Sequence, residues 1–231
     1  MNGKKSRENS YPGGIEPSFL DRLARFWPCP REQLHFGGWQ ATRQLMTRLQ
    51  VDTASHILDI CCGEGGTACW LAQSLELRVD GVDILEKAIE TARARAKRMN
   101  VSDLARFTVA NVFDLPFPDR TFDLIYGQDP DGLAHQDRKK IFRECRRVLE
   151  PGCLLGFQHW IAGDDMPPNV YERFERITSA GYPFMKHLRV GDYKRDLLAA
   201  GFSQIEITSL RDLYHEHVVK MRDISRKRDA K

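Results

Sequence analysis

The sequence predicts an α/β fold, a doubly wound and mostly parallel sheet with helices on both faces. Short apolar runs at residues 57–60, 78–83, 106–110 and 121–126 predict buried strands. Amphipathic helical patterns separate these runs, as expected where crossover helices join parallel strands. A glycine-rich turn at residues 63–66 connects the first strand to the first of these helices. Strands, crossover helices and this turn together indicate a Rossmann-like architecture.

The turn after the first strand has the composition of a ligand site. Gly63, Gly65 and Gly66 lead into an amphipathic helix, whose first backbone N–H groups can meet a ligand. Glycine also lets a ligand lie against the backbone without a Cβ in the way. The spacing fits the loose dinucleotide fingerprint G-x-G-x-x-G/A. Asp59 and Glu64, however, would repel a diphosphate and favour a ligand with a cationic end.

Length and composition indicate one globular domain. The chain has 231 residues, and its 42% hydrophobic and 29% charged content is ordinary for a globular protein. The net charge of +3 is too small to indicate a polyanionic partner. We find no apolar run of membrane-spanning length and no signal peptide. The six cysteines have neither a C-x-x-C nor a zinc spacing, so we expect reduced thiols and a cytoplasmic protein.

The strand–turn–helix unit resembles motif I of the class I S-adenosylmethionine (SAM)-dependent methyltransferases, D-x-G-x-G-x-G. Asp59, Gly63 and Gly65 match this motif, and Cys61 replaces its first glycine. The resemblance implies that these four residues line a SAM site. SAM carries an ammonium and a sulfonium but no phosphate, which suits the two acids of the turn.

Two further segments extend the predicted SAM site. The second strand ends at Asp83, where a carboxylate can accept hydrogen bonds from both ribose hydroxyls. Ile84 beside it could pack on the adenine. Residues 111–119 resemble the G-D-A-x-x-L-P-F-P-D segment of the same family. That resemblance implies that the Asn111 side chain and the backbone N–H of Val112 hold the adenine.

The loop after the fourth strand resembles the S-Q-D-A-x-L-H-x-x-D-R segment of sarcosine/dimethylglycine and sugar O-methyltransferases. The matching residues are Gln128, Asp129, His135, Asp137 and Arg138. The resemblance implies that Gln128 contacts the cofactor and that Asp129 and His135 face the methyl acceptor.

His159 follows the fifth strand, predicted at residues 153–157. The related sugar O-methyltransferases carry at this position an Asp that pairs with the His matching His135. Two facing histidines could supply a general base and its orienting partner. Alternatively, both are ordinary polar residues of a strand end and a loop. His35 could join them around a metal, but such scattered histidines are weak evidence, and we predict no metal site.

The predicted parts of the chain follow from these motifs. They are a flexible arm (1–17), a helical lid (18–50), the SAM-binding core (51–161), a substrate-cap insertion (162–192), and a C-terminal helix with strand six and a basic tail (193–231). Within the lid, residues 34–39 are similar to an L-H-F-G-Y-W stretch that closes over SAM and the substrate in some small-molecule methyltransferases. The alternative is a helix pair that covers a sheet edge.

The end of the chain departs from the family pattern. We predict strand six at residues 202–210, followed by a charged helix instead of a second apolar strand. Strand seven is therefore missing, or a partner chain fills its place in a homodimer. In the helix after the second strand, the basic run at residues 93–98 predicts a solvated face.

We predict a SAM-dependent methyltransferase that acts on a small molecule, without a specific nucleic-acid or membrane partner. Asp129 favours an amine acceptor, the histidine pair favours a hydroxyl, and the amine is the preferred choice. Trp39, Tyr171 and Tyr182 are the predicted aromatic lining. One alternative is an NAD(P)-dependent oxidoreductase, disfavoured by Glu64 and by the lack of a hydride-transfer set. The other is a non-catalytic SAM-binding or scaffold protein.

Overall fold

The computed structural model describes residues 33, 35–130, 137–181 and 189–229. Its centre is a five-stranded sheet in the order β3-β2-β1-β4-β5, and every neighbouring pair is parallel. The strands are β1 (His56–Ile60), β2 (Arg78–Asp83), β3 (Ala105–Val109), β4 (Phe122–Gln128) and β5 (Leu149–Gln158). The chain therefore has the doubly wound parallel sheet that the sequence predicts.

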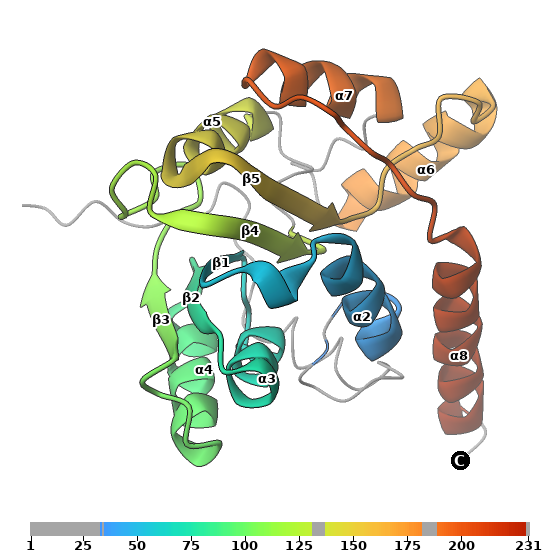
Figure 1. The fold of residues 1–231 in the computed structure, drawn as a ribbon. Coiled ribbons are helices and arrows are strands. Elements are labelled where there is room, and N and C mark those ends of the chain that lie inside the picture. Colours follow the sequence, from blue (N-terminus) through green and yellow to red (C-terminus); the bar gives the residue numbers. More distant parts are fainter. Residues whose placement is uncertain (1–32, 34, 131–136, 182–188, 230–231) are drawn as a thin grey trace, which may run out of the picture.

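Helices cover both faces of the sheet (Figure 1). They are α2 (Gly38–Arg48), α3 (Gly66–Leu75), α4 (Glu86–Arg98), α5 (Arg138–Val148), α6 (Pro168–Gly181), α7 (Val190–Ala199) and α8 (Arg211–Asp229), and the short 3-10 helix η1 (Val51–Thr53) precedes β1. Figure 1 shows α3 and α4 on one side of the sheet and α5 and α7 on the other, with α8 set off beyond α2.

Each face of the sheet has its own apolar core. Ile57 of β1 packs with residues of α2, α3 and α4, whereas Leu58 and Ile60 pack with residues of α5 and α7. All three side chains are fully buried. A strand covered on both faces has no solvent side, so its sequence is a continuous apolar run. This explains why the first strand was recognisable from residues 57–60 alone.

The prediction of strand six is wrong. Residues 202–210 form no strand; Gln204 has a left-handed φ of 54°, and the side chain of Ile207 is 39% exposed. A strand needs a hydrogen-bonded neighbour, and residues 202–210 alone contain no information about one. The segment is instead held to α2 by an ion pair between Arg48 and Glu206, with an N···O distance of 2.6 Å. Within the described ranges no strand follows β5.

Candidate active site

The carboxyl ends of the central strands form one edge of the sheet. The register aligns Asp59 of β1 with Tyr126 of β4, and Gln128 with Gln158 of β5. Parallel strands place the loops that follow them at the same edge, and ligands of doubly wound folds bind there. The predicted SAM residues all lie on these strand ends or in the loops after them.

The glycine turn contains two glycines with different roles. Gly63 and Gly65 both have left-handed backbone angles, φ 53° and 71°. A Cβ on Gly65 would lie 2.6 Å from Cζ of Phe107, so this glycine permits close packing against β3. A Cβ on Gly63 would meet no atom within 4 Å. Space for a ligand therefore adjoins Gly63, not Gly65. Cys61 is also left-handed, with φ 55°, which a glycine would adopt without strain.

Asp83 connects the end of β2 to the glycine turn. Its Oδ2 accepts a hydrogen bond from the Gly63 N–H at 3.0 Å, and its Oδ1 accepts one from the Leu85 N–H at 2.9 Å. Burial raises the pKa of this carboxyl, and the backbone donors oppose that shift. Each carboxylate oxygen has further lone pairs with which it can accept a ligand hydroxyl. Asp83 therefore both shapes the turn and offers an acceptor beside it.

The segment after β3 forms a tight turn. Oδ1 of Asn111 accepts a hydrogen bond from the Phe113 N–H at 3.0 Å, and Asn111 also bridges to Asp114. The Val112 side chain is buried in the core, so only its backbone can reach a ligand. Ile84, after β2, is half-buried.

Asp59 does not carry the charge expected from the sequence. Its side chain is only 4% exposed, and its Oδ2 accepts a hydrogen bond from the Tyr126 hydroxyl at 2.7 Å. Burial raises the pKa of Asp59 to about 8, against the smaller opposing effect of that hydrogen bond. The carboxyl is therefore mostly protonated at neutral pH, and its repulsion of a diphosphate is weaker than predicted.

The charge of Glu64 is also compensated. Arg95 on α4 places a guanidinium nitrogen 3.5 Å from the Glu64 carboxylate and donates from Nε to the Glu64 carbonyl at 2.9 Å. The Arg95 side chain is buried, so it does not belong to the solvated face predicted for the basic run of this helix. The sequence argument misplaced Arg95 because a buried arginine and a surface arginine look alike in a charged run. Glu64 and Arg95 instead fasten the turn to α4.

Comparison with known proteins agrees with this geometry. A family model described as a methyltransferase domain matches residues 57–152. The chain is 30% identical over 197 residues to the 27-O-demethylrifamycin SV methyltransferase of Amycolatopsis mediterranei, covering 80% of this chain and 70% of that protein. It is 24% identical to the glycine/sarcosine/dimethylglycine N-methyltransferase of Actinopolyspora halophila, covering 88% of this chain and 35% of that protein.

The fold also matches a solved structure from Galdieria sulphuraria, titled a sarcosine dimethylglycine methyltransferase, with a TM-score of 0.73 at 19% identity. That alignment covers 83% of this chain and 72% of the other. The chain belongs to the class I SAM-dependent methyltransferases. Its cofactor is SAM, and its function is methyl transfer. The alternative of an NAD(P)-dependent oxidoreductase is thereby removed.

In this methyltransferase, Gln128 belongs to a closed ring of side-chain hydrogen bonds. Its Oε1 accepts from the Thr67 hydroxyl at 2.8 Å, and its Nε2 donates to the Thr42 hydroxyl at 3.0 Å. Thr42 donates to Oε1 of Gln33 at 2.7 Å, and Nε2 of Gln33 donates to Thr67 at 3.2 Å. Each group both donates and accepts, so the four polar side chains satisfy one another. We call this set the polar ring; it joins β4, α3, α2 and the segment before α2.

Residues 35–37 lie against the ends of β4 and β5. The Phe36 N–H donates to Oδ2 of Asp129 at 2.7 Å, and the Phe36 carbonyl accepts from Nε2 of Gln158 at 2.5 Å. His35 is buried, with Nε2 2.9 Å from the Thr42 hydroxyl and 2.9 Å from Nε2 of Gln128. Desolvation lowers the pKa of His35 to about 4, so this ring is neutral. His35 therefore supports the polar ring instead of joining a histidine cluster.

The two predicted catalytic histidines are only partly described. His135 lies outside the described residues. His159 directly follows β5, both of its ring nitrogens are buried, and its ring centroid is 6.1 Å from that of Tyr193 on α7. The pairing of the two histidines is therefore still a prediction. Within the described ranges, no group of three His, Cys, Asp or Glu side chains could hold a metal ion.

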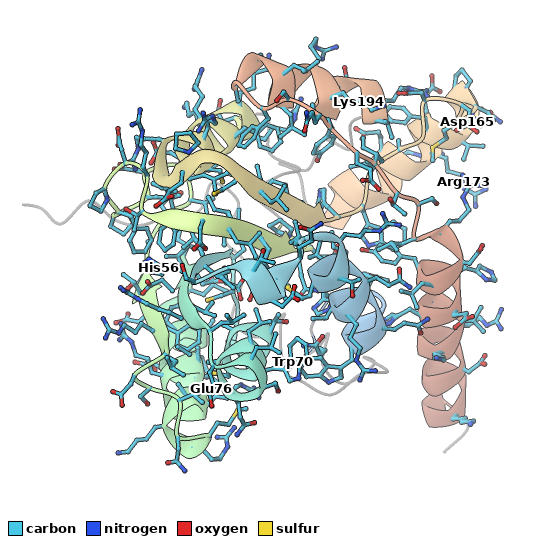
Figure 2. All side chains as sticks on the ribbon, viewed as in Figure 1. His56, Trp70, Glu76, Asp165, Arg173 and Lys194 are labelled. Atoms are coloured by element: carbon cyan, nitrogen blue, oxygen red, sulfur yellow. The ribbon has the colours of Figure 1, made fainter. Side chains whose placement is uncertain are left out.

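The three residues of the predicted aromatic lining are also only partly described. Trp39 of α2 packs edge-on against Trp70 of α3, with ring centroids 5.4 Å apart. Trp70 is labelled in Figure 2. Tyr171 of α6 lies under the guanidinium of Arg189, 4.8 Å from the ring centroid. Tyr182 lies outside the described residues.

Sequence reasoning missed several residues of this edge. Tyr214 and His217 of α8 contact residues 36–37 and Asp129. Their only sequence signal was the helical spacing of apolar and polar residues in the C-terminal region. Such spacing indicates a packed face but does not identify what it packs against.

Proposed function

We propose that SAM binds beside Gly63, at the carboxyl ends of β1 and β2, with Asp83 as the acceptor for its ribose hydroxyls. The observation that carries this proposal is the open space at Gly63 next to a carboxylate that already accepts the Gly63 N–H. In the same proposal, Ile84, Asn111 and the Val112 backbone hold the adenine. Asp59 and Gly65 keep the shape of the turn, Cys61 lines it, and Gln128 holds its flank through the polar ring.

SAM, when bound, supplies a methyl group that its sulfonium already activates. The protein's contribution is then mostly to position the acceptor and to exclude water. An ammonium near Asp59 would favour the ionised form of this carboxyl and so lower its pKa from about 8. The buried acid is therefore suited to a cationic ligand, although it is largely neutral without one.

Replacing Asp83 tests the cofactor site. We expect Asp83→Ala to weaken SAM binding at least roughly tenfold, because it removes a charge-assisted acceptor and the anchor of the Gly63 N–H. Isothermal titration calorimetry on folded protein measures the effect. The matched control is Asp103→Ala, since Asp103 is an exposed acid. Equal SAM affinity in Asp83→Ala and the parent would remove Asp83 from the site.

We propose a small-molecule methyl acceptor, with an amine nitrogen preferred over a hydroxyl oxygen. Relatives of both kinds support a small-molecule acceptor. The rifamycin enzyme is named for an O-methylation and the Actinopolyspora enzyme for an N-methylation. Asp129 favours a cationic amine, although both of its oxygens already accept hydrogen bonds from Phe36 and Tyr214. The burial of His159 beside Tyr193 is the observation that favours a hydroxyl.

Methyl transfer from labelled SAM to a panel of amines and of hydroxylated metabolites tests the acceptor class. Activity on amines alone supports the preferred choice, and activity on hydroxyls alone supports the second. Transfer to neither, in protein that binds SAM, would favour a non-catalytic SAM-binding protein.

The wider setting of the protein is also a proposal. In the described part of the chain, no helix has both the length and the apolarity needed to span a bilayer. The thiols of Cys62, Cys69, Cys145 and Cys153 are free, which favours a reducing, cytoplasmic environment. A homodimer through the edge of β5 is the assembly that we propose, because no described strand pairs with that edge. The small net charge disfavours nucleic acid as a partner.

A further inference from the structure

The C-terminal helix α8 reaches the carboxyl edge of the sheet through two polar side chains. Nδ1 of His217 accepts a hydrogen bond from the Gly37 N–H at 3.1 Å. The Tyr214 hydroxyl donates to Oδ1 of Asp129 at 3.3 Å and accepts from Nε2 of Gln158 at 3.0 Å. Tyr214 and His217 are 7% and 4% exposed, respectively, in a helix that is otherwise mostly exposed. The contacts of α8 with this edge are therefore specific and buried.

Aromatic packing reinforces these hydrogen bonds. The Phe36 ring lies 5.5 Å from Tyr214, 5.0 Å from His217 and 4.8 Å, edge-on, from Trp160 after β5. Trp160 and Tyr214 are 4.7 Å apart. A Cβ built on Gly37 would come within 2.9 Å of the Leu213 side chain, which shows how closely the backbone approaches α8. Residues 36 and 37 are therefore enclosed between α8 and the strand ends.

The same short segment is connected to the glycine turn. Residues 35–37 are followed by α2, whose Thr42 belongs to the polar ring, and Gln33 precedes them in that ring. Thr67, the member of the polar ring on α3, lies in the first turn of that helix, directly after Gly65 and Gly66. A series of buried contacts thus runs from α8, through Gln33 and residues 35–42, to the helix that follows the predicted SAM turn.

We propose that Tyr214 and His217 of α8 are positioning residues for the SAM site. They hold residues 36–37 and Asp129 in place, and the polar ring carries that constraint to Thr67 and Gln128. Desolvation lowers the pKa of His217 to about 4, so its ring is neutral and Nδ1 can accept the Gly37 N–H. In this proposal, α8 contributes to SAM binding through the residues that it positions. This inference rests on the cofactor site proposed above.

The test compares SAM binding in variants of the two residues. His217→Leu removes the acceptor of Gly37, whereas His217→Asn keeps an oxygen acceptor near the position of Nδ1. Tyr214→Phe keeps the ring and removes the hydroxyl. We expect His217→Leu and Tyr214→Phe each to weaken SAM binding by roughly fivefold or more, and His217→Asn to restore most of the affinity. The matched control is His215→Leu, because His215 lies on the exposed face of the same helix.

Calorimetric titration with SAM, well below the melting temperature of every variant, separates positioning from stability. A lowered melting temperature with unchanged SAM affinity in His217→Leu and Tyr214→Phe would overturn the proposal. So would equal loss in His217→Asn and His217→Leu, or equal loss in the His215→Leu control. If His217→Leu does not fold, the SAM affinity of Tyr214→Phe alone decides whether the proposal holds. Asp83→Ala is measured in parallel: if it also binds SAM normally, the cofactor site itself is misplaced, and that failure is distinct from a failure of α8.

Discussion

At the scale of single residues, the site is built from groups whose local environment changes their chemistry. Asp59 is an acid that burial keeps largely protonated, and Glu64 is an acid that Arg95 neutralises. Both are in or next to the glycine turn, where the sequence suggested exposed negative charge. Repulsion of a diphosphate by these two acids is therefore weaker than the sequence suggested.

Cys61 provides a test of backbone strain in this turn. Its left-handed φ of 55° costs a residue with a Cβ about 1 kcal/mol, and glycine avoids that cost. The greater entropy that glycine loses on folding offsets part of the gain. We expect Cys61→Gly to raise the melting temperature by up to a few degrees, measured by thermal unfolding. Cys61→Ala is the matched control, because it removes the thiol and keeps the strain. An equal rise in both variants would assign the effect to the thiol.

Asp59 gives the protein a predictable dependence on pH. In the unfolded chain this acid ionises near its ordinary pKa of 3.8, whereas burial raises the folded pKa to about 8. Folding therefore takes up a proton between these values, and the stability present below pH 4 is progressively lost as the pH rises toward 8. Asp59→Asn removes this loss and keeps an acceptor for the Tyr126 hydroxyl. We expect its advantage in melting temperature over the parent to grow by several degrees between pH 5 and pH 8.

The control for that series is Asp103→Asn, an exposed acid for which no such growth is expected. A constant difference between Asp59→Asn and the parent across the pH range would show that the buried carboxyl does not titrate as described.

At the scale of elements, a buried ion pair joins α5 to α7. Arg138 donates to Asp196, and the two side chains are 5% and 1% exposed. The Arg138 guanidinium also lies 5.5 Å from the ring centroid of Tyr193. These contacts hold α7 against α5, whose Phe142 ring centroid lies 6.3 Å from that of Tyr193.

Breaking this pair should destabilise the protein strongly. Asp196→Ala leaves a buried guanidinium without its carboxylate, which costs about 3–5 kcal/mol. At this chain length the expected fall in melting temperature is on the order of 10 °C, measured by thermal unfolding. Asp223→Ala breaks an exposed ion pair with Arg222 and should change the melting temperature by no more than about 2 °C. A fall of similar size in both variants would contradict the role assigned to the buried pair.

The elements also show what a sequence can reveal. The bounds predicted for β2 are those of the structure, because a short apolar run is a recognisable pattern of a buried strand. The prediction of strand six was wrong because the sequence of residues 202–210 contains no information about a pairing partner. The polar ring was not predictable either. Gln33 and Gln128 are ordinary residues far apart in the chain, and only the packed fold brings them together.

At the scale of the whole molecule, segments from both ends of the described chain meet at the carboxyl edge of the sheet. Residues 35–37 come from one end and α8 from the other, and residues 36–37 contact Asp129 after β4, Gln158 of β5 and His217 of α8. Figure 1 shows that α8 stands apart from the layered core. This edge therefore depends on contacts between distant segments, whereas the core beneath it is built from successive strands and helices.

The chemistry at this edge can be decided by the pH dependence of the rate. If His135 or His159 is a general base for a hydroxyl acceptor, kcat/KM should fall below a pKa near that of imidazole, about 6.5. His135→Ala or His159→Ala should then cost roughly 10²-fold or more in kcat/KM. If an amine is only aligned, both variants should keep most of their rate, and the profile should follow the pKa of the acceptor. His215→Ala, on the exposed face of α8, is the control. Full activity of both histidine variants on the best acceptor of the panel eliminates a histidine base and leaves alignment of an amine as the mechanism.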